Sequence, residues 1–132
     1  MNFIARVKSI KSVDSLNIVE FEFNNQVFQM VSLDLNNEIK IDKKVELLIK
    51  PTDIIISKDF IEDISIPNQA LARITNIEQG KLLSSVILQL SDTTFESIIT
   101  TDFLKKLNLK KYDEVNILIK ATNLSIFKVL DD

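Results

Sequence analysis

The sequence of this chain contains one segment twice. The run LLIKPTDIII in the middle returns near the C-terminus as ILIKATNLSI. Outside this segment the two halves still match, and the offset between them rises only from 67 (Ala5 to Ala72) to 70 (Lys50 to Lys120). Such a small drift indicates two copies of one unit whose lengths differ only in loops. The chain is therefore constrained to fold as a tandem pair.

The repeat predicts two domains, residues 1–60 and residues 65–130. The short charged stretch between them ends at Pro67, which cannot donate to a central strand ladder and so marks a boundary. Units of about sixty residues have small cores and are marginally stable alone. Each repeat is expected to rest on the other repeat, on a second chain, or on both. A homo-oligomer is therefore predicted, with dimer and trimer both open.

Alternating apolar and polar residues predict antiparallel strands. Residues 19–23 read Val-Glu-Phe-Glu-Phe, and their mates at 86–90 keep apolar residues at the inward positions. A two-residue turn follows each, Asn24-Asn25 or Ser91-Asp92, and then another apolar segment, which is typical of a hairpin. Further strands are predicted at residues 3–10, 27–31, 45–50 and 54–57 of the first repeat, and at 70–77, 95–99, 115–120 and 124–127 of the second.

Only residues 101–107 have helical spacing, with Thr101 as the expected N-cap. The first repeat is two residues shorter at this point, so its helix is expected to shrink to a turn. The single glycine, Gly80, lies in a hairpin loop, where it is expected to supply a positive backbone angle. Five strands per repeat, with a helical turn before the fourth, predict an all-β chain of two tandem five-stranded OB-like barrels.

The composition excludes several classes of function. Without Cys or His, the chain has no thiol nucleophile, no catalytic triad and none of the usual zinc or copper ligands, so no metal cation is expected. A single glycine excludes the Gly-rich loops that hold nucleotide phosphates. Glu20 and Glu22 have outward parity, Asp131-Asp132 are read as a solvated tail, and no two acids are paired for acid–base catalysis. We expect neither enzyme activity nor an organic cofactor.

Charge and hydropathy argue against nucleic acid and membrane as partners. The net charge is −3 and the pI is about 5, whereas a protein that binds a phosphate backbone has clustered Lys and Arg. Phe21, Phe23 and Phe28 could stack bases, but the inward parity of Phe21 and Phe23 favours a place in the core. No uncharged apolar run approaches the roughly 18 residues of a membrane span, and the N-terminus does not read as a signal peptide. A cytoplasmic protein without membrane insertion is predicted.

Two tripeptides of the pattern Lys-X-Thr are the best candidates for a binding site. Lys50-Pro51-Thr52 and Lys120-Ala121-Thr122 each follow an apolar strand and precede another. A cation, a hydroxyl and backbone amides at a strand corner suit a small anion. Ser32 and Thr100 end the third strand of each repeat, and Ser65 precedes the linker proline, so all three are further short donors. Lys and Thr are also common at turns, where the ordinary role of such a Lys is that of a solvated gatekeeper.

Four stretches of the second repeat form a recognisable set: residues 65–74, 97–100, 107–110 and 119–122. Together they resemble the Mop or TOBE family of molybdate-binding domains, which reads Ser-Ala-Arg-Asn in the first stretch and Ala-Ile-Thr in the second. In the last stretch the family has Lys-Ala-Thr or Lys-Ala-Ser, and this chain has Lys-Ala-Thr. As a tandem pair, the chain is similar to the C-terminal di-TOBE segment of the molybdate transporter ATPase and to free-standing molbindins.

The resemblance implies oligomers with exchanged or shared strands, and molybdate or tungstate held at interfaces by backbone amides, hydroxyls and a lysine. Two positions depart from the family pattern: Pro67 replaces an Arg, and Phe103 replaces a common site hydroxyl. The first repeat lacks the opening stretch, so a site that uses Lys50 must borrow residues from elsewhere or be degenerate. Carried over by position, the oxyanion ligands are Ser65, Asn68, Thr100, Lys120, Ala121 and Thr122, with Ser32, Lys50 and Thr52 as weaker counterparts.

The resemblance thus implies a non-catalytic, cytoplasmic protein that binds molybdate or tungstate for storage, homeostasis or sensing. One alternative is a regulatory module that acts in trans on a molybdate ABC transporter ATPase, because the chain has the family segment without a nucleotide-binding part. The other alternative is an OB-type module that binds oligonucleotides.

Overall fold

The computed structural model describes residues 1–130, and the expected solvated tail, Asp131-Asp132, lies outside the described residues. Ten strands, one short helix and two 3-10 turns follow the order of the two repeats within this range. The first repeat forms β1 (Asn2–Val13), β2 (Leu16–Phe23), β3 (Gln26–Ser32), β4 (Lys44–Leu48), the turn η1 (Pro51–Asp53) and β5 (Ile55–Ser57). The second forms β6 (Asn68–Gln79), β7 (Leu83–Leu90), β8 (Thr93–Thr100), α1 (Thr101–Lys106), β9 (Glu114–Ile119), the turn η2 (Ala121–Asn123) and β10 (Ser125–Val129).

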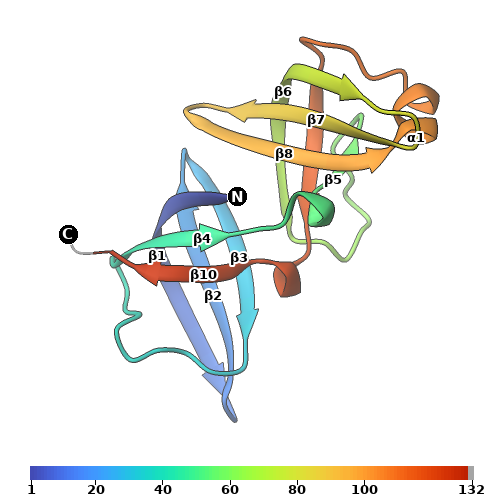
Figure 1. The fold of residues 1–132 in the computed structure, drawn as a ribbon. Helices are drawn as coiled ribbons and strands as arrows, with labels where there is room; N and C mark the ends of the chain where they lie inside the picture. The colour runs from blue at the N-terminus through green and yellow to red at the C-terminus, as the bar shows by residue number, and fades with distance from the viewer. Residues whose placement is uncertain (131–132) are drawn as a thin grey trace.

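The predicted fold class is confirmed: two curled five-stranded sheets account for nearly all of the regular structure (Figure 1). All of the strand pairs are antiparallel. The long first strand of each repeat carries a bulge at an equivalent place, between Val7 and Ser9 and between Ile74 and Asn76. Since a bulge bends its strand and increases the local twist, this pair explains how both sheets curl in the same way.

Each sheet contains one strand from the other repeat. The strand orders are β10-β4-β1-β2-β3 and β5-β9-β6-β7-β8, so the last strand of each repeat completes the opposite sheet. Figure 1 shows β10 lying along β4, far from the other strands of its own repeat. The domain limits 1–60 and 65–130 stay a prediction, because each sheet contains strands from both ranges.

The backbone on either side of the two 3-10 turns explains this exchange. Lys50 (φ −84°, ψ 139°) and Ile54 (φ −93°, ψ 120°) are both extended, and Lys120 and Leu124 repeat this pattern at η2. A turn with extended residues on both sides carries the chain onward and does not fold β5 back onto β4. The short strands β5 and β10 therefore pair with a strand that is already in their path, β9 and β4 respectively.

The buried side chains of the two repeats form one continuous core. Phe3 and Phe23 of the first repeat lie with their ring centroids 5.2 Å and 6.5 Å from that of Phe95 in the second. Phe21 and Phe28 are fully buried, and Phe23 is 5% exposed, so none of the three can form a platform for stacked bases. Each small repeat is therefore packed against the other repeat of the same chain, which was one of the two sources of stability expected for it.

Two asparagines join the repeats by hydrogen bonds outside the ladders. The fully buried Asn68 at the start of β6 uses both ends of its amide on Gln29 of β3: Nδ2 donates to the carbonyl oxygen (2.8 Å), and Oδ1 accepts from the N–H (2.6 Å). This amide thus imitates one rung of a β-ladder. Asn24 in the first hairpin turn donates from Nδ2 to Thr93 Oγ1 (2.8 Å), so the two β-hairpins also touch. Asn24 and Asn25 both have positive φ (48° and 62°), as a tight hairpin turn requires.

Two local predictions were wrong. The N-cap of α1 is Thr100, which accepts from the Phe103 N–H, and Thr101 is buried with its hydroxyl bonded to the Gly80 carbonyl (2.9 Å). Gly80 itself does not have positive φ. A Cβ at this position would lie 2.4 Å from the Leu83 carbonyl oxygen, so close approach of two backbones explains this glycine. The first repeat, as predicted, has only turns where α1 lies in the second.

We expect Asn68→Leu to destabilise the protein strongly, because it leaves the N–H and C=O of Gln29 without partners at the contact between the two repeats. The expected loss is about 2–4 kcal/mol of unfolding free energy. Urea denaturation followed by far-UV circular dichroism measures it. Asn76→Leu is the matched control, since Asn76 is exposed on the same strand and should change stability by less than about 0.5 kcal/mol. Equal losses in the two variants would contradict the role assigned to Asn68.

Candidate functional site

The two Lys-X-Thr tripeptides form corners of nearly the same backbone geometry. In each, an extended lysine follows a buried isoleucine and begins a 3-10 turn, closed by Asp53 N–H to Lys50 O (2.9 Å) or Asn123 N–H to Lys120 O (3.0 Å). Both lysines and both threonines are exposed. Within residues 1–130, neither lysine ammonium makes an ion pair or a hydrogen bond to a side chain. The corners therefore present an unpaired cation beside a hydroxyl.

Strand exchange places each corner beside the other repeat. The turn η2 packs against β3 of the first repeat, and η1 packs against β8 of the second. Ser32 at the end of β3 and Thr122 consequently line one cavity, whereas Thr100 at the end of β8 lines another together with Thr52. Each cavity is thus lined by residues from both repeats, although the sequence reasoning had assigned the candidate ligands repeat by repeat. Thr100 of the second repeat thus lies beside Thr52 of the first corner. Whether a site that uses Lys50 borrows this hydroxyl or is degenerate stays a prediction.

Each cavity lies between the two edge strands of one sheet. In the described part of the chain, no ladder joins β10 to β3 or β5 to β8, so neither barrel closes completely. The first cavity runs between residues 30–32 of β3 and residues 125–129 of β10. The second runs between residues 98–100 of β8 and residues 55–56 of β5. The threonine of each corner therefore stands at the end of a seam that is open to solvent. The other predicted corner ligands, Lys50, Lys120 and Ala121, are not among the residues that line the two cavities.

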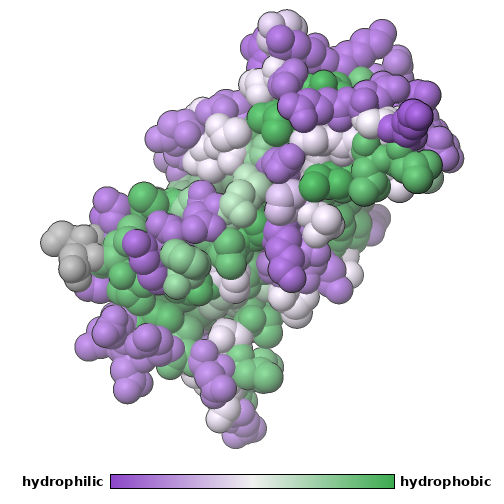
Figure 2. Space-filling model, viewed as in Figure 1, coloured by the Kyte–Doolittle hydropathy of each residue, from purple (hydrophilic) through white to green (hydrophobic). Residues whose placement is uncertain are grey.

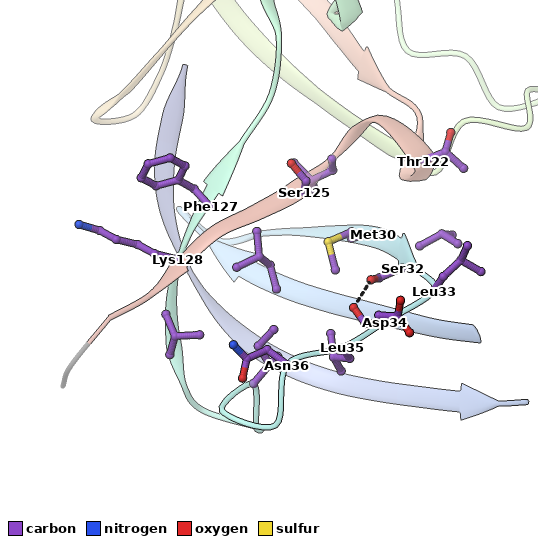
Figure 3. A pocket seen from close by; sticks show the side chains of 15 residues that line it. Met30, Ser32, Leu33, Asp34, Leu35, Asn36, Thr122, Ser125, Phe127 and Lys128 are labelled. Carbon is purple, nitrogen blue, oxygen red and sulfur yellow. Dashed lines mark hydrogen bonds between the residues drawn. The ribbon is translucent and has the colours of Figure 1, made fainter. Parts of the chain in front are cut away.

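The seam between β3 and β10 has the more polar lining. Figure 3 shows Thr122 on the turn at one end of this cavity and Ser125 farther along β10, with Lys128 pointing away from it. Ser32 donates from Oγ to the Asp34 carbonyl (2.9 Å), which holds the loop after β3 against the cavity. Ser125 and Asp34, which line this cavity, were missed by the sequence reasoning. Ser125 could have been found, because it is the one polar residue that replaces an isoleucine in the repeated segment.

The seam between β5 and β8 is lined almost entirely by apolar side chains. Thr52 and Thr100 are the hydroxyl-bearing residues in its wall. Phe103, which replaces a common hydroxyl of the family, lies in the same wall and is 53% exposed. The other residues that line this seam are Ile54, Ile55, Ile56, Leu83, Ile98, Ile99 and Leu107. Figure 2 shows the resulting apolar surface next to α1.

The other two predicted ligands, Ser65 and Asn68, do not belong to either corner. Ser65 is exposed in the loop between β5 and β6, and Pro67 ends that loop. The amide of Asn68 bonds to Gln29 and the residue is fully buried, so in this arrangement Asn68 joins the repeats and is not exposed to a ligand. Groups of three or more metal-ligating side chains do not occur in the described residues, nor does a helix that is long and apolar enough to cross a membrane.

Comparison with known proteins identifies the second repeat. Residues 64–126 match the model of the TOBE domain. The second repeat is therefore similar to a TOBE domain over most of its length. The first repeat has the same order of strands and turns.

The whole fold matches that of a solved protein. A crystal structure of the cytoplasmic molybdate-binding protein ModG, in a PEG-grown form with molybdate bound, superposes with a TM-score of 0.86. The two chains are 21% identical, and the match covers 96% of this chain and 94% of ModG. At that identity the match shows that the two chains share a fold over nearly their full length. Among curated protein sequences, none matches this chain significantly.

Proposed function

We propose that this protein binds a tetrahedral oxyanion of the molybdate or tungstate type, without catalysing a reaction, and serves storage, homeostasis or sensing in the cytoplasm. The observation that carries the proposal is the corner at Lys120, where an unpaired, exposed ammonium begins a turn whose threonine, Thr122, lines an open seam. The TOBE match and the fold shared with a molybdate-binding protein support the same reading.

The chemistry of this corner suits a small anion. The N–H of Ala121 begins a 3-10 turn and has no partner among the described residues. Together with the Lys120 ammonium and the Thr122 hydroxyl it offers three kinds of donor within three consecutive residues. Hydrogen bonds in which one partner is charged are roughly twice as strong as neutral ones, so a dianion gains most from such a set. No residue of the turn carries a negative charge.

The ligand set predicted from the sequence is best satisfied by more than one chain. Within one chain, Ser32 lies across the seam from Thr122 with its O–H donated to the Asp34 carbonyl, while Thr100 lies beside Thr52 in the other seam. Ser65 is on a separate exposed loop. If Ser65 and Thr100 also bind the oxyanion held by Lys120, a second copy must bring them there. We therefore propose a homo-oligomer with shared sites.

The apolar seam supports this oligomer. Ile55, Leu83 and Phe103 are 44%, 59% and 53% exposed, and they gather around one groove. A contiguous apolar surface with such large side chains is typical of an interface between proteins. The other two hypotheses gain no such support, since the aromatic platform for oligonucleotides is buried. Action in trans on a transporter ATPase stays a prediction of the sequence.

Isothermal titration with molybdate and with tungstate tests the function directly. We expect uptake at micromolar concentration for at least one of the two, and weaker uptake of sulfate at the same ionic strength. Absence of heat and of bound metal after equilibrium dialysis with either anion would contradict the proposal.

Replacing the two corner lysines separately ranks the corners. Lys120→Ala should weaken oxyanion binding by about 10- to 100-fold, because a hydrogen bond to a charged group contributes about 1.5–3 kcal/mol. Lys50→Ala is the matched variant in the same backbone setting and should cause a smaller loss. Affinities come from the same titration, and equal losses would show that the ranking is wrong.

Light scattering coupled to size exclusion measures the oligomer. The protein should elute as a dimer or trimer of the 15.1 kDa chain, and Phe103→Ser should shift it toward the monomer. Phe60→Ser is the matched control, because Phe60 is similarly exposed (61%) and lines neither seam. A monomer at all concentrations, with and without oxyanion, would contradict shared sites.

A further inference from the structure

The two corners share their backbone geometry, so differences between their side chains can be interpreted directly. Both begin with an extended lysine, both carry threonine at the second position of the turn, and both are closed by the same hydrogen bond. The turns differ at two positions only: Pro51 corresponds to Ala121, and Asp53 corresponds to Asn123. Both differences bear on the binding of an anion.

Pro51 removes a donor from the first corner. Proline has no N–H, whereas the N–H of Ala121 is unpaired among the described residues. An anion at the first corner would therefore lose one backbone hydrogen bond that the second corner can provide.

Asp53 adds a negative charge to the first corner. Its carboxylate is half-buried, adjoins Thr52 in the sequence, and has no ion-pair partner within residues 1–130. Asn123 at the equivalent place is neutral and similar in shape. A carboxylate within one turn of a bound dianion repels it, and the repulsion grows as water is excluded.

The surroundings of the first corner do not offset this charge. The seam beside Thr52 is lined by apolar side chains and two threonines, and no lysine or arginine lines it. Both repeats have an exposed aspartate after the third strand, Asp34 in the first and Asp102 in the second. Asp34 lines the seam beside Thr122, whereas Asp102 does not line the seam beside Thr52. Within the turns themselves, only Asp53 carries a charge.

We propose that Asp53, together with Pro51, keeps the first corner free of oxyanion, so that each chain binds only at the corner that contains Lys120. The inference rests on the proposed function. If so, Asp53 determines how many oxyanions a chain binds. The first corner then keeps the backbone geometry of the second but binds no oxyanion.

The experiment measures the number of molybdate ions bound per chain, by titration calorimetry and by metal analysis after dialysis. It compares the wild type with Asp53→Asn, with Pro51→Ala/Asp53→Asn, and with the reciprocal variant Asn123→Asp. We expect the double variant to bind twice as many ions per chain as the wild type, and Asp53→Asn to add weaker sites. Asn123→Asp should lower the affinity at least tenfold. Circular dichroism shows whether each variant is folded.

The outcomes separate the two proposals. A wild type that binds molybdate and a folded double variant that binds no more of it would overturn the role of Asp53 while leaving the proposed function intact. Unchanged affinity in Asn123→Asp would overturn it as well, and this result does not depend on the double variant. If the wild type binds none, the proposed function itself fails.

Discussion

The structure depends on the reciprocal exchange of β5 and β10. Each strand leaves its own repeat through an extended corner and forms a ladder with the fourth strand of the other repeat. A sheet without its exchanged strand would leave β4 or β9 with an unpaired edge, and buried backbone groups without partners are costly. The ring contacts of Phe95 with Phe3 and Phe23, and the amide of Asn68 on Gln29, join the same two halves. The two repeats therefore fold as one interlocked body.

The same exchange determines where chemistry can occur. Both Lys-X-Thr tripeptides lie at the points where the chain crosses from one sheet to the other. Each crossing strand stays unpaired on its outer side, so an open seam begins at each corner. The proposed site is thus a consequence of how the two sheets are completed. The difference between the corners, in contrast, lies in two side chains, Pro51 and Asp53.

Local pattern predicted the strands well, because each prediction relied on interactions between near neighbours. The alternation at 19–23 and 86–90 corresponds to buried and outward residues of β2 and β7, and Asn24-Asn25 form the turn that their positive φ values allow. The errors at Thr101 and Gly80 have one cause. Both positions lie at one hairpin turn, where the Thr101 hydroxyl bonds the Gly80 carbonyl and the Gly80 backbone lies against that of Leu83. Neither contact is visible in the apolar pattern of the sequence.

The sequence by itself determined the duplication, the strand content and the two corner motifs, since each of these is written in short stretches whose residues interact locally. The sequence also shows that Pro51 and Asp53 differ from Ala121 and Asn123. These differences can be interpreted only once the structure shows that the two turns have the same backbone geometry. Tertiary structure alone decided which strand completes which sheet, and therefore that Thr122 lies across from Ser32 and Thr52 beside Thr100. The physical reason is that β5 and β10 are short strands of similar pattern, so their own residues do not specify a partner. The partner is specified by the direction in which the extended corners carry the chain, and by the edges that β4 and β9 leave open.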